Sequence, residues 1–166
     1  MIDRRAPVTR SVRQYNFLFG KENTFMKALG IEFSSNKLIY VLVETTDGNL
    51  SVLSSNKLEL ADTRDRDALV AFQTALRAVF NTTAPDVIGI KAKPEKGQMS
   101  AGAAALKMEG ISLACSPCPV HFLSGAKINA CEAPEDGMKK YQIPALKSAI
   151  LALETPRDSP GSGHTK

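Results

Sequence analysis

The sequence predicts an α/β protein with a mixed five-stranded sheet, opened by a three-strand antiparallel meander and continued by crossover helices. Three strand-like segments separated by turn residues occupy roughly residues 26–60. After residue 65, amphipathic helical segments alternate with short apolar strands, an order that is typical of parallel strands joined by helices. The chain has 166 residues and 43% hydrophobic content, which is enough for one domain with a buried core.

The first predicted strand begins near Met26 and alternates in character. Leu29, Ile31 and Phe33 point to one face of the strand, whereas Gly30 and Glu32 point to the other. Gly30 lets another part of the chain approach the backbone closely beside Glu32. This arrangement makes Glu32, the only acidic residue of the strand, the first candidate for a functional residue.

The next two strands complete the meander. Residues 38–43 form an unbroken apolar run, as in a strand covered on both faces. The Asp-Gly pair within residues 46–49 predicts a hairpin turn, because it accepts positive φ angles. A third strand follows over about residues 50–60, with residues 54–56 as a possible interruption.

The rest of the predicted domain alternates helices and strands. In chain order these are a helix over 65–80, a strand over 86–90, a small-residue helix over 98–109 ended by Gly110, strand-like pieces over 111–114 and 119–123, a polar stretch over 124–142 and a last helix from Pro144.

Charge separates the ends of the chain from its body. Residues 1–25 hold five basic and two acidic residues, a net charge of +3. Residues 155–166 hold two basic residues and one acidic residue, a net charge of +1. Residues 26–154 hold 14 of each. We therefore predict a flexible N-terminal extension over 1–25, one domain over 26–154 and a disordered tail over 155–166. The neutral body gives no general support for nucleic-acid binding, although a local patch stays possible.

Composition also indicates a compartment. No apolar run is long enough to span a membrane, and the N-terminus lacks the apolar segment of a secretory signal. Three cysteines, an odd number, suit a reducing environment better than a disulfide scaffold. These features favour a cytoplasmic protein with no membrane partner. The sequence allows a homodimer through sheet edges but does not fix the oligomeric state.

In this order of elements the chain resembles the ribonuclease H-like superfamily, in particular its RuvC-like branch. The matching segments are LGIEFSS for the first strand, PDVIGIKA for the fourth, the Gly/Ala-rich helix after it, and PALKSAILAL for the last helix. The resemblance covers about residues 27–154 and is nearest to a small uncharacterised bacterial family of the same layout. It implies a ribonuclease H-like fold.

The resemblance also implies where a site would lie. Active members of the superfamily hold two divalent ions between carboxylates on the first strand, the fourth strand and the last helix, and use them for phosphodiester cleavage. Here Glu32 matches the first position, Lys91 the second, and Lys147 or Ser148 the third. Magnesium and manganese need oxygen ligands, and an ammonium group adds positive charge instead. We therefore assign no catalytic residue and expect Glu32 and the lysines to form an ion pair or an anion pocket.

The main hypothesis is thus a catalytically degenerate, pseudo-nuclease module that acts by binding or assembly. One alternative is a divergent metal-dependent nuclease, in which Glu44, Glu59 or Glu109 joins Glu32. The basic strip formed by Lys91, Lys93, Lys96 and Lys107 could bind nucleic-acid phosphates or another anion, or could be a solvated loop.

A second alternative is a zinc- or anion-binding regulatory protein. Cys115, Cys118, His121 and Cys131 have the spacing C-x2-C-x2-H-x9-C, and thiolate and imidazole ligands suit zinc. This spacing is not that of a standard zinc finger. The alternative to a zinc site is that these are buried free cysteines beside a histidine on a strand. The sequence leaves both open.

Overall fold

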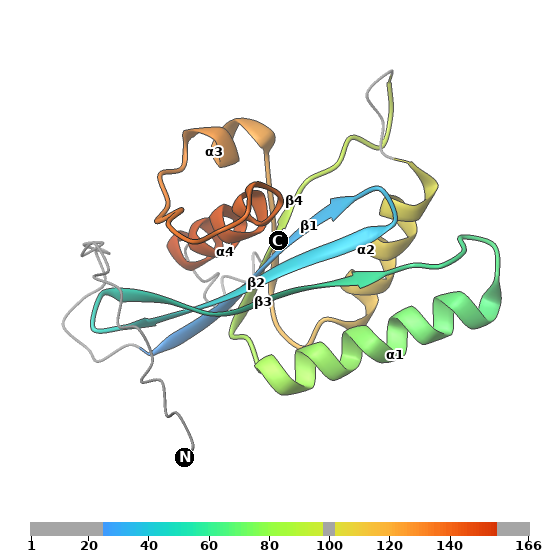
Figure 1. The fold of residues 1–166 in the computed structure, drawn as a ribbon, viewed down its shortest axis with the longest axis horizontal. Coiled ribbons are helices and arrows are strands. Elements are labelled where there is room, and N and C mark those ends of the chain that lie inside the picture. Colours follow the sequence, from blue (N-terminus) through green and yellow to red (C-terminus); the bar gives the residue numbers. More distant parts are fainter. Residues whose placement is uncertain (1–24, 98–101, 156–166) are drawn as a thin grey trace, which may run out of the picture.

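The computed structural model describes residues 25–97 and 102–155, and Figure 1 shows their arrangement. The strands are β1 (Met26–Ser34), β2 (Lys37–Thr46), β3 (Asn49–Glu59), β4 (Val87–Lys91) and β5 (Val120–Leu123). The helices are α1 (Arg66–Thr83), α2 (Ala103–Cys115), α3 (Gly125–Ala130) and α4 (Ile143–Glu154), and a 3-10 turn, η1 (Lys140–Gln142), precedes α4. The predicted extension and tail, except for Phe25 and Thr155, lie outside the described residues.

The five strands form one mixed sheet in the order β3-β2-β1-β4-β5. β2 pairs antiparallel with both β1 and β3, as the predicted meander requires. β4 pairs parallel with β1 and with β5, so each of these pairs is connected by a crossover. The predicted fold class is therefore confirmed, with β1 near the centre of the sheet.

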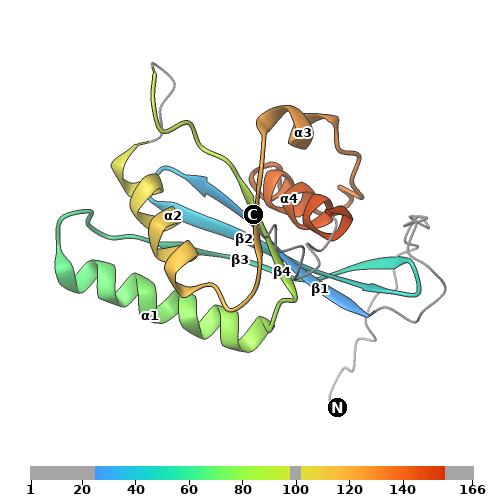
Figure 2. The same ribbon diagram turned by 180° about the vertical axis from the view of Figure 1, so that it is seen from behind.

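Helices cover both faces of the sheet in three layers (Figures 1 and 2). α4 covers one face, where its apolar side chains pack with Ala28 and Val87. α1 and α2 cover the other face, where Leu29, Ile31 and Phe33 are completely buried. The alternation of β1 thus decides which residues face α4, and Glu32 has the same parity as Ala28.

Two glycines allow α4 to lie unusually close to the sheet. A Cβ atom added to Gly30 would come within 1.7 Å of the carbonyl oxygen of Ala145. One added to Gly89 would come within 2.1 Å of the carbonyl oxygen of Ser148. The expected close approach at Gly30 is therefore an approach of the last helix, two residues before Glu32 on the same strand.

The structure corrects the prediction for residues 98–114. We predicted that a helix ends at Gly110 and that a strand follows, but α2 continues through this glycine to Cys115. Gly110 lies on an open side of the helix, where an added Cβ would meet nothing within 4 Å. A glycine in such a place weakens a helix without ending it. Residues 98–101, the predicted start, lie outside the described residues.

Two smaller differences concern β3 and the polar stretch over 124–142. β3 is continuous, but its register with β2 shifts by one residue, because Leu42 pairs with Ser54 and Val43 pairs with Val52. The polar stretch contains α3, whose first turn is capped by Ser124. The hydroxyl of Ser124 accepts a hydrogen bond from the Lys127 N–H at 3.2 Å.

Among the described residues, no helix has the length and apolar character that crossing a membrane requires.

Candidate functional site

Glu32 is a buried carboxylate held by two lysines. The residue is 7% exposed, and one of its oxygens, Oε1, lies 2.9 Å from Nζ of Lys93 and 3.5 Å from Nζ of Lys91. Both ammonium groups donate to that oxygen. The other oxygen, Oε2, is buried and has no hydrogen-bond partner. These three side chains, Glu32, Lys91 and Lys93, are called the Glu32 group below. The group contains one carboxylate and two ammonium groups, and one carboxylate oxygen in it has no hydrogen-bond partner.

The sheet places these three side chains. Gly30 pairs with Gly89 across the parallel β1–β4 ladder, so two residues further along Glu32 comes beside Lys91 at the end of β4. Lys93 follows two residues later, just after the strand, and folds back onto the same oxygen. Lys93 was predicted only as part of a lysine-rich loop, and the signal that could have marked it is its two-residue spacing from Lys91, which puts both side chains on one side of an extended segment.

The third predicted position does not join this group. The ammonium of Lys147 lies 3.3 Å from the carboxylate of Glu135, in the segment before η1, and its side chain is only 15% exposed. Ser148 is completely buried, and its hydroxyl donates to the carbonyl oxygen of Pro144 at 2.8 Å within α4. The ion pair that we predicted for Glu32 thus involves Lys91 and Lys93, and not Lys147.

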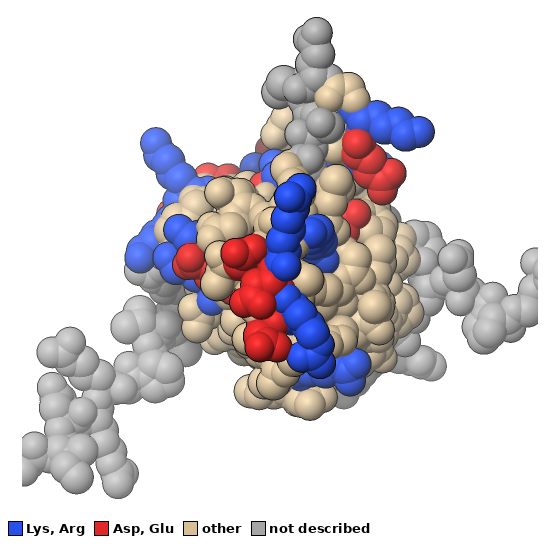
Figure 3. Space-filling view, turned by 90° about the vertical axis from the view of Figure 1, so that its right-hand side faces the viewer, with Lys and Arg blue, Asp and Glu red and all other residues tan. Residues whose placement is uncertain are grey.

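The other lysines of the predicted basic strip are dispersed. Lys96 is exposed in the loop after β4, and the ammonium of Lys107 donates to the carbonyl oxygen of Thr63 before α1. Figure 3 looks onto the right-hand side of Figure 1, toward which β1 and the loop after β4 extend, and shows basic and acidic side chains interleaved there. The lysines do not make this side a uniformly basic surface.

The carboxylates that could have completed a metal site lie elsewhere. Glu44 pairs with Lys27, five residues before Glu32, which is roughly 17 Å along the strand. Glu59, at the end of β3, accepts a hydrogen bond from Asn36 at 3.1 Å. Glu109 projects from α2, which covers the face of the sheet opposite α4. Glu44 and Glu109 thus lie on the face opposite α4, whereas Glu59 faces the same side of the sheet as Glu32 but lies on β3, two strands away from β1.

Glu109 is itself unusual, because it is 8% exposed and its Oε2 atom has no hydrogen-bond partner. Burial raises the pKa of this carboxyl above its ordinary value, and the nearby charge of Glu95 raises it further.

The four predicted zinc ligands are divided between the two faces of the sheet. Cys115 and Cys118 pack against the core under α1 and α2, whereas Cys131 packs against the core under α4. Burial raises the pKa of Cys118 to about 11, which disfavours the thiolate that zinc requires. In residues 25–97 and 102–155, no three His, Cys, Asp or Glu side chains are grouped so that they could hold a metal ion.

The two-metal chemistry of the fold can be tested against these donors. A divalent ion needs several oxygen ligands, but the one oxygen of Glu32 that has partners is already bound to two ammonium groups. Cations in those positions repel a metal ion instead of binding it. The residues present therefore do not fit a two-metal site.

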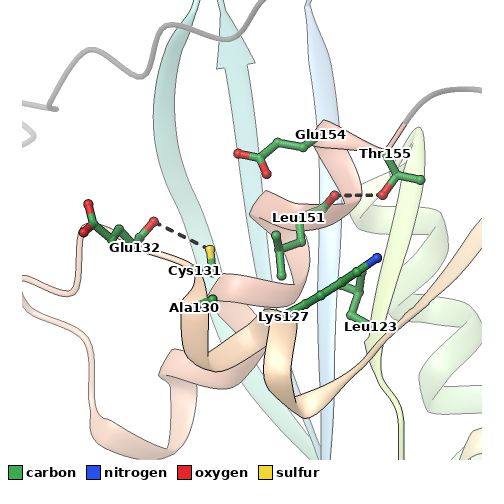
Figure 4. Close-up of a pocket in the computed structure, with 8 residues that line it drawn as sticks. All are labelled: Leu123, Lys127, Ala130, Cys131, Glu132, Leu151, Glu154 and Thr155. Atoms are coloured by element: carbon green, nitrogen blue, oxygen red, sulfur yellow. Dashed lines mark hydrogen bonds between the residues drawn. The ribbon is translucent and has the colours of Figure 1, made fainter.

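A pocket that the sequence did not predict lies at the C-terminal end of α4 (Figure 4). Its volume is about 650 Å³, and it lies between β5, α3 and the last turn of α4, where Leu123, Cys131, Leu151 and Glu154 contribute to its walls. Burial, followed by the charge of Glu154, raises the pKa of the Cys131 thiol. None of the residues of the Glu32 group lines this pocket.

The same architecture occurs in solved resolvase structures. A Thermus thermophilus RuvC structure matches with a TM-score of 0.60 and 12% identity, over 75% of this chain and 92% of that one. T. thermophilus RuvC in complex with Holliday junction substrate matches with a TM-score of 0.56 and 11% identity, over 75% and 90%. The yeast mitochondrial Holliday junction resolvase matches with a TM-score of 0.50 and 9% identity, over 76% and 75%.

These likenesses show that the chain has a ribonuclease H-like fold similar to that of RuvC. Residues 26–152 match the family described as protein of unknown function DUF3010, and the chain belongs to this family. No curated protein was found to match the sequence.

Proposed function

We propose that this protein is a catalytically degenerate RuvC-like module that acts by binding or assembly, and that its ligand carries phosphate groups. The observation that supports this most directly is the 2.9 Å contact between Lys93 Nζ and Glu32 Oε1. In this proposal an ammonium group takes the place of a metal ion beside the first-strand carboxylate.

The chemistry of an ammonium group explains why we propose binding without cleavage. A metal ion that assists phosphodiester cleavage activates a water molecule and stabilises the leaving oxygen. The ammonium groups of Lys91 and Lys93 can donate hydrogen bonds and contribute positive charge, but they have no coordination site for a nucleophilic water. They can hold a phosphate in place and do little to break its ester bond.

The charge balance of the group favours an anionic ligand. Two ammonium groups and one carboxylate leave a formal charge of +1, and the lysine side chains are 28% and 22% exposed, so a ligand can reach them. One of the similar structures is a complex with a Holliday junction substrate, which makes branched DNA the first ligand to test. Phosphate contacts of this kind are strongly salt-dependent.

The test uses the full chain with a labelled four-way junction, duplex DNA and single-stranded DNA, each in EDTA, Mg²⁺ or Mn²⁺. We expect binding without metal and no cleavage. The double variant Lys91→Gln/Lys93→Gln should bind more weakly and should reduce the slope of log K against log salt by about 1–2. The double variant Lys127→Gln/Lys140→Gln is the matched control, since these lysines lie outside the Glu32 group.

Two results would contradict the proposal. Metal-dependent cleavage that disappears in Glu32→Gln would make the protein a divergent nuclease. Binding that is the same in the Lys91/Lys93 double variant and in wild type would place the ligand elsewhere on the protein.

A further inference from the structure

β3 is a long, open edge of the sheet. It contains 11 residues and, within residues 25–97 and 102–155, pairs only with β2, whereas the other edge strand, β5, contains four. Figure 1 shows β3 running along the sheet from the hairpin with β2 to the loop before α1. An edge strand presents unpaired backbone N–H and C=O groups, and proteins normally shield long edges with proline, charge, bulges or covering segments.

Only part of β3 carries such shielding. It has no proline, its charged residues are Lys57 and Glu59, and Val52 and Leu53 are 40% and 45% exposed. The register shift makes Leu53 the extra residue of a bulge, because its neighbours Val52 and Ser54 pair with consecutive residues of β2. Beyond the bulge, residues 54–59 form a regular segment with an open edge.

The hydrogen bonds of this segment show which groups face outward. The backbone N–H of Lys57 donates to the side chain of Asn56 at 2.9 Å and so takes no part in the ladder with β2. Since outward-facing residues alternate along an antiparallel strand, Ser55 and Glu59 also present their backbone groups to the open edge. An incoming strand must match this pattern.

We propose that a second copy of this chain pairs with residues 54–59 of β3 about a two-fold axis at Asn56, so that two five-stranded sheets become one. In this register Ser55 pairs with the partner's Lys57, and Lys57 with the partner's Ser55. The residues of each such pair both face outward and exchange two backbone hydrogen bonds when the Lys57 N–H donates to the partner's Ser55 carbonyl instead of to the Asn56 side chain. The arrangement satisfies both copies with one interface, as a closed dimer requires.

Side-chain charge selects this register over its neighbour. A two-fold axis at Lys57 would place two lysines directly opposite each other, which is unfavourable. With the axis at Asn56, Lys57 lies opposite a serine and Ser54 lies opposite the partner's Leu58, so no like charges meet. β3 is separated from β1 by β2, and the dimer therefore leaves the Glu32 group of each copy open.

The axis position gives a sharp test, because the two copies of Asn56 form a non-hydrogen-bonded pair with about 4.5 Å between Cα atoms. Asn56 is exposed, so substitution is compatible with folding of each chain. Full-length Asn56→Asp and Asn56→Lys each place like charges at the axis, and each should raise the dimer Kd at least about tenfold in sedimentation velocity. An equimolar mixture of the two should form a heterodimer, visible by native mass spectrometry.

The matched controls are Asn129→Asp and Asn129→Lys, the same changes at an exposed position on α3, which should leave the dimer intact. A wild-type chain that stays monomeric at high micromolar concentration would overturn the proposal. A dimer that is equally stable in both Asn56 variants would also overturn it, because the interface would then lie elsewhere.

Discussion

At the scale of single residues, the stability of β1 depends on how the buried carboxylate of Glu32 is compensated. Its side chain is 9% exposed, and Lys93 provides the shorter of its two ion-pair contacts. Removing one partner of a buried pair leaves a charge that is neither solvated nor paired, which costs more than the pair itself contributes. The two lysines therefore have a structural role whatever ligand they bind.

We accordingly expect Lys93→Met to lower the free energy of unfolding by about 1–3 kcal/mol in urea titrations. Glu32→Gln/Lys93→Met should lose less than Lys93→Met alone, because no carboxylate is then left uncompensated. Lys96→Met, at an exposed lysine of the same loop, should change stability by less than about 0.5 kcal/mol. Equal losses in the single and double variants would show that the contact between Lys93 and Glu32 is not stabilising.

Glu109 gives the second residue-scale prediction. Its pKa in the folded protein is raised, first by burial and then by Glu95, so the folded state favours the protonated form. The stability that protonation contributes is complete below the unfolded pKa and is lost as pH rises through the folded pKa. Glu109→Gln should therefore reduce this loss and stabilise the protein by about 1 kcal/mol at neutral pH.

The check is urea unfolding followed from pH 4 to pH 8 for wild type and for Glu109→Gln. Glu95→Gln is the control, since it removes the smaller cause and leaves burial, so it should keep most of the pH dependence. Parallel pH profiles for wild type and Glu109→Gln would show that this carboxyl does not control stability in that range.

The residues of the Glu32 group could be predicted from the sequence only in part. Parity and family resemblance placed Glu32 and Lys91 on one side of adjacent strands, because strand geometry is regular. The partners of Lys93 and Lys147 depend on the path of the loop after β4 and on the orientation of α4 against the sheet. The local sequence pattern determines neither of these. Long lysine side chains reach several partners, and only the packed structure shows that Lys147 reaches Glu135 instead of Glu32.

At the scale of elements, the contact between α4 and the sheet depends on the absence of two side chains. The helix backbone occupies the space in which a side chain at Gly30 or Gly89 would lie. Substituting either glycine forces backbone against backbone, which cannot be relieved by a change of rotamer. The small residues that face the sheet from α4, such as Ala145 and Ala149, are all buried for the same reason.

We expect Gly30→Ala to destabilise the protein by about 3 kcal/mol, measured by urea unfolding, because α4 must move away from β1. Gly110→Ala is the matched control. It makes the same chemical change inside α2, where the added methyl group meets nothing, and should stabilise the helix by about 0.5–1 kcal/mol. Similar effects at the two positions would contradict the close packing of α4.

Gly110 also shows what the sequence pattern misses at this scale. The meander and α1 were predicted closely because turn residues and an amphipathic stripe mark them. α2 has apolar residues around most of its circumference, so its continuation over 111–115 had no helical periodicity to distinguish it from a strand. Its end at Cys115 does have a local signal, because Ser116 is followed by Pro117, and proline disfavours helix at itself and at the residue before it.

At the scale of the whole molecule, the sheet separates two hydrophobic cores. Residues that pack into different cores cannot form one site. Residues close in sequence, such as Cys118 and Cys131, lie on opposite sides of the sheet, because the chain reaches β5 from the α2 side and leaves it toward α3 and α4. The order of elements predicted the fold class because it fixes the topology. The order alone does not say on which side of the sheet a loop residue packs, and so the cysteine spacing suggested a cluster that the fold divides.

A consequence for the whole protein is that its stability should not depend on a metal ion. We expect the thermal midpoint to be unchanged by EDTA, because no three suitable ligands meet among the described residues and the thiols face different cores. Differential scanning calorimetry with and without chelator, together with elemental analysis for zinc, tests this on the full chain. The variant Cys131→Ser separates the explanations: if zinc holds the fold, it should lose both the metal and several degrees of thermal stability. If the sheet separates the thiols, it should change neither the metal content nor the response to EDTA.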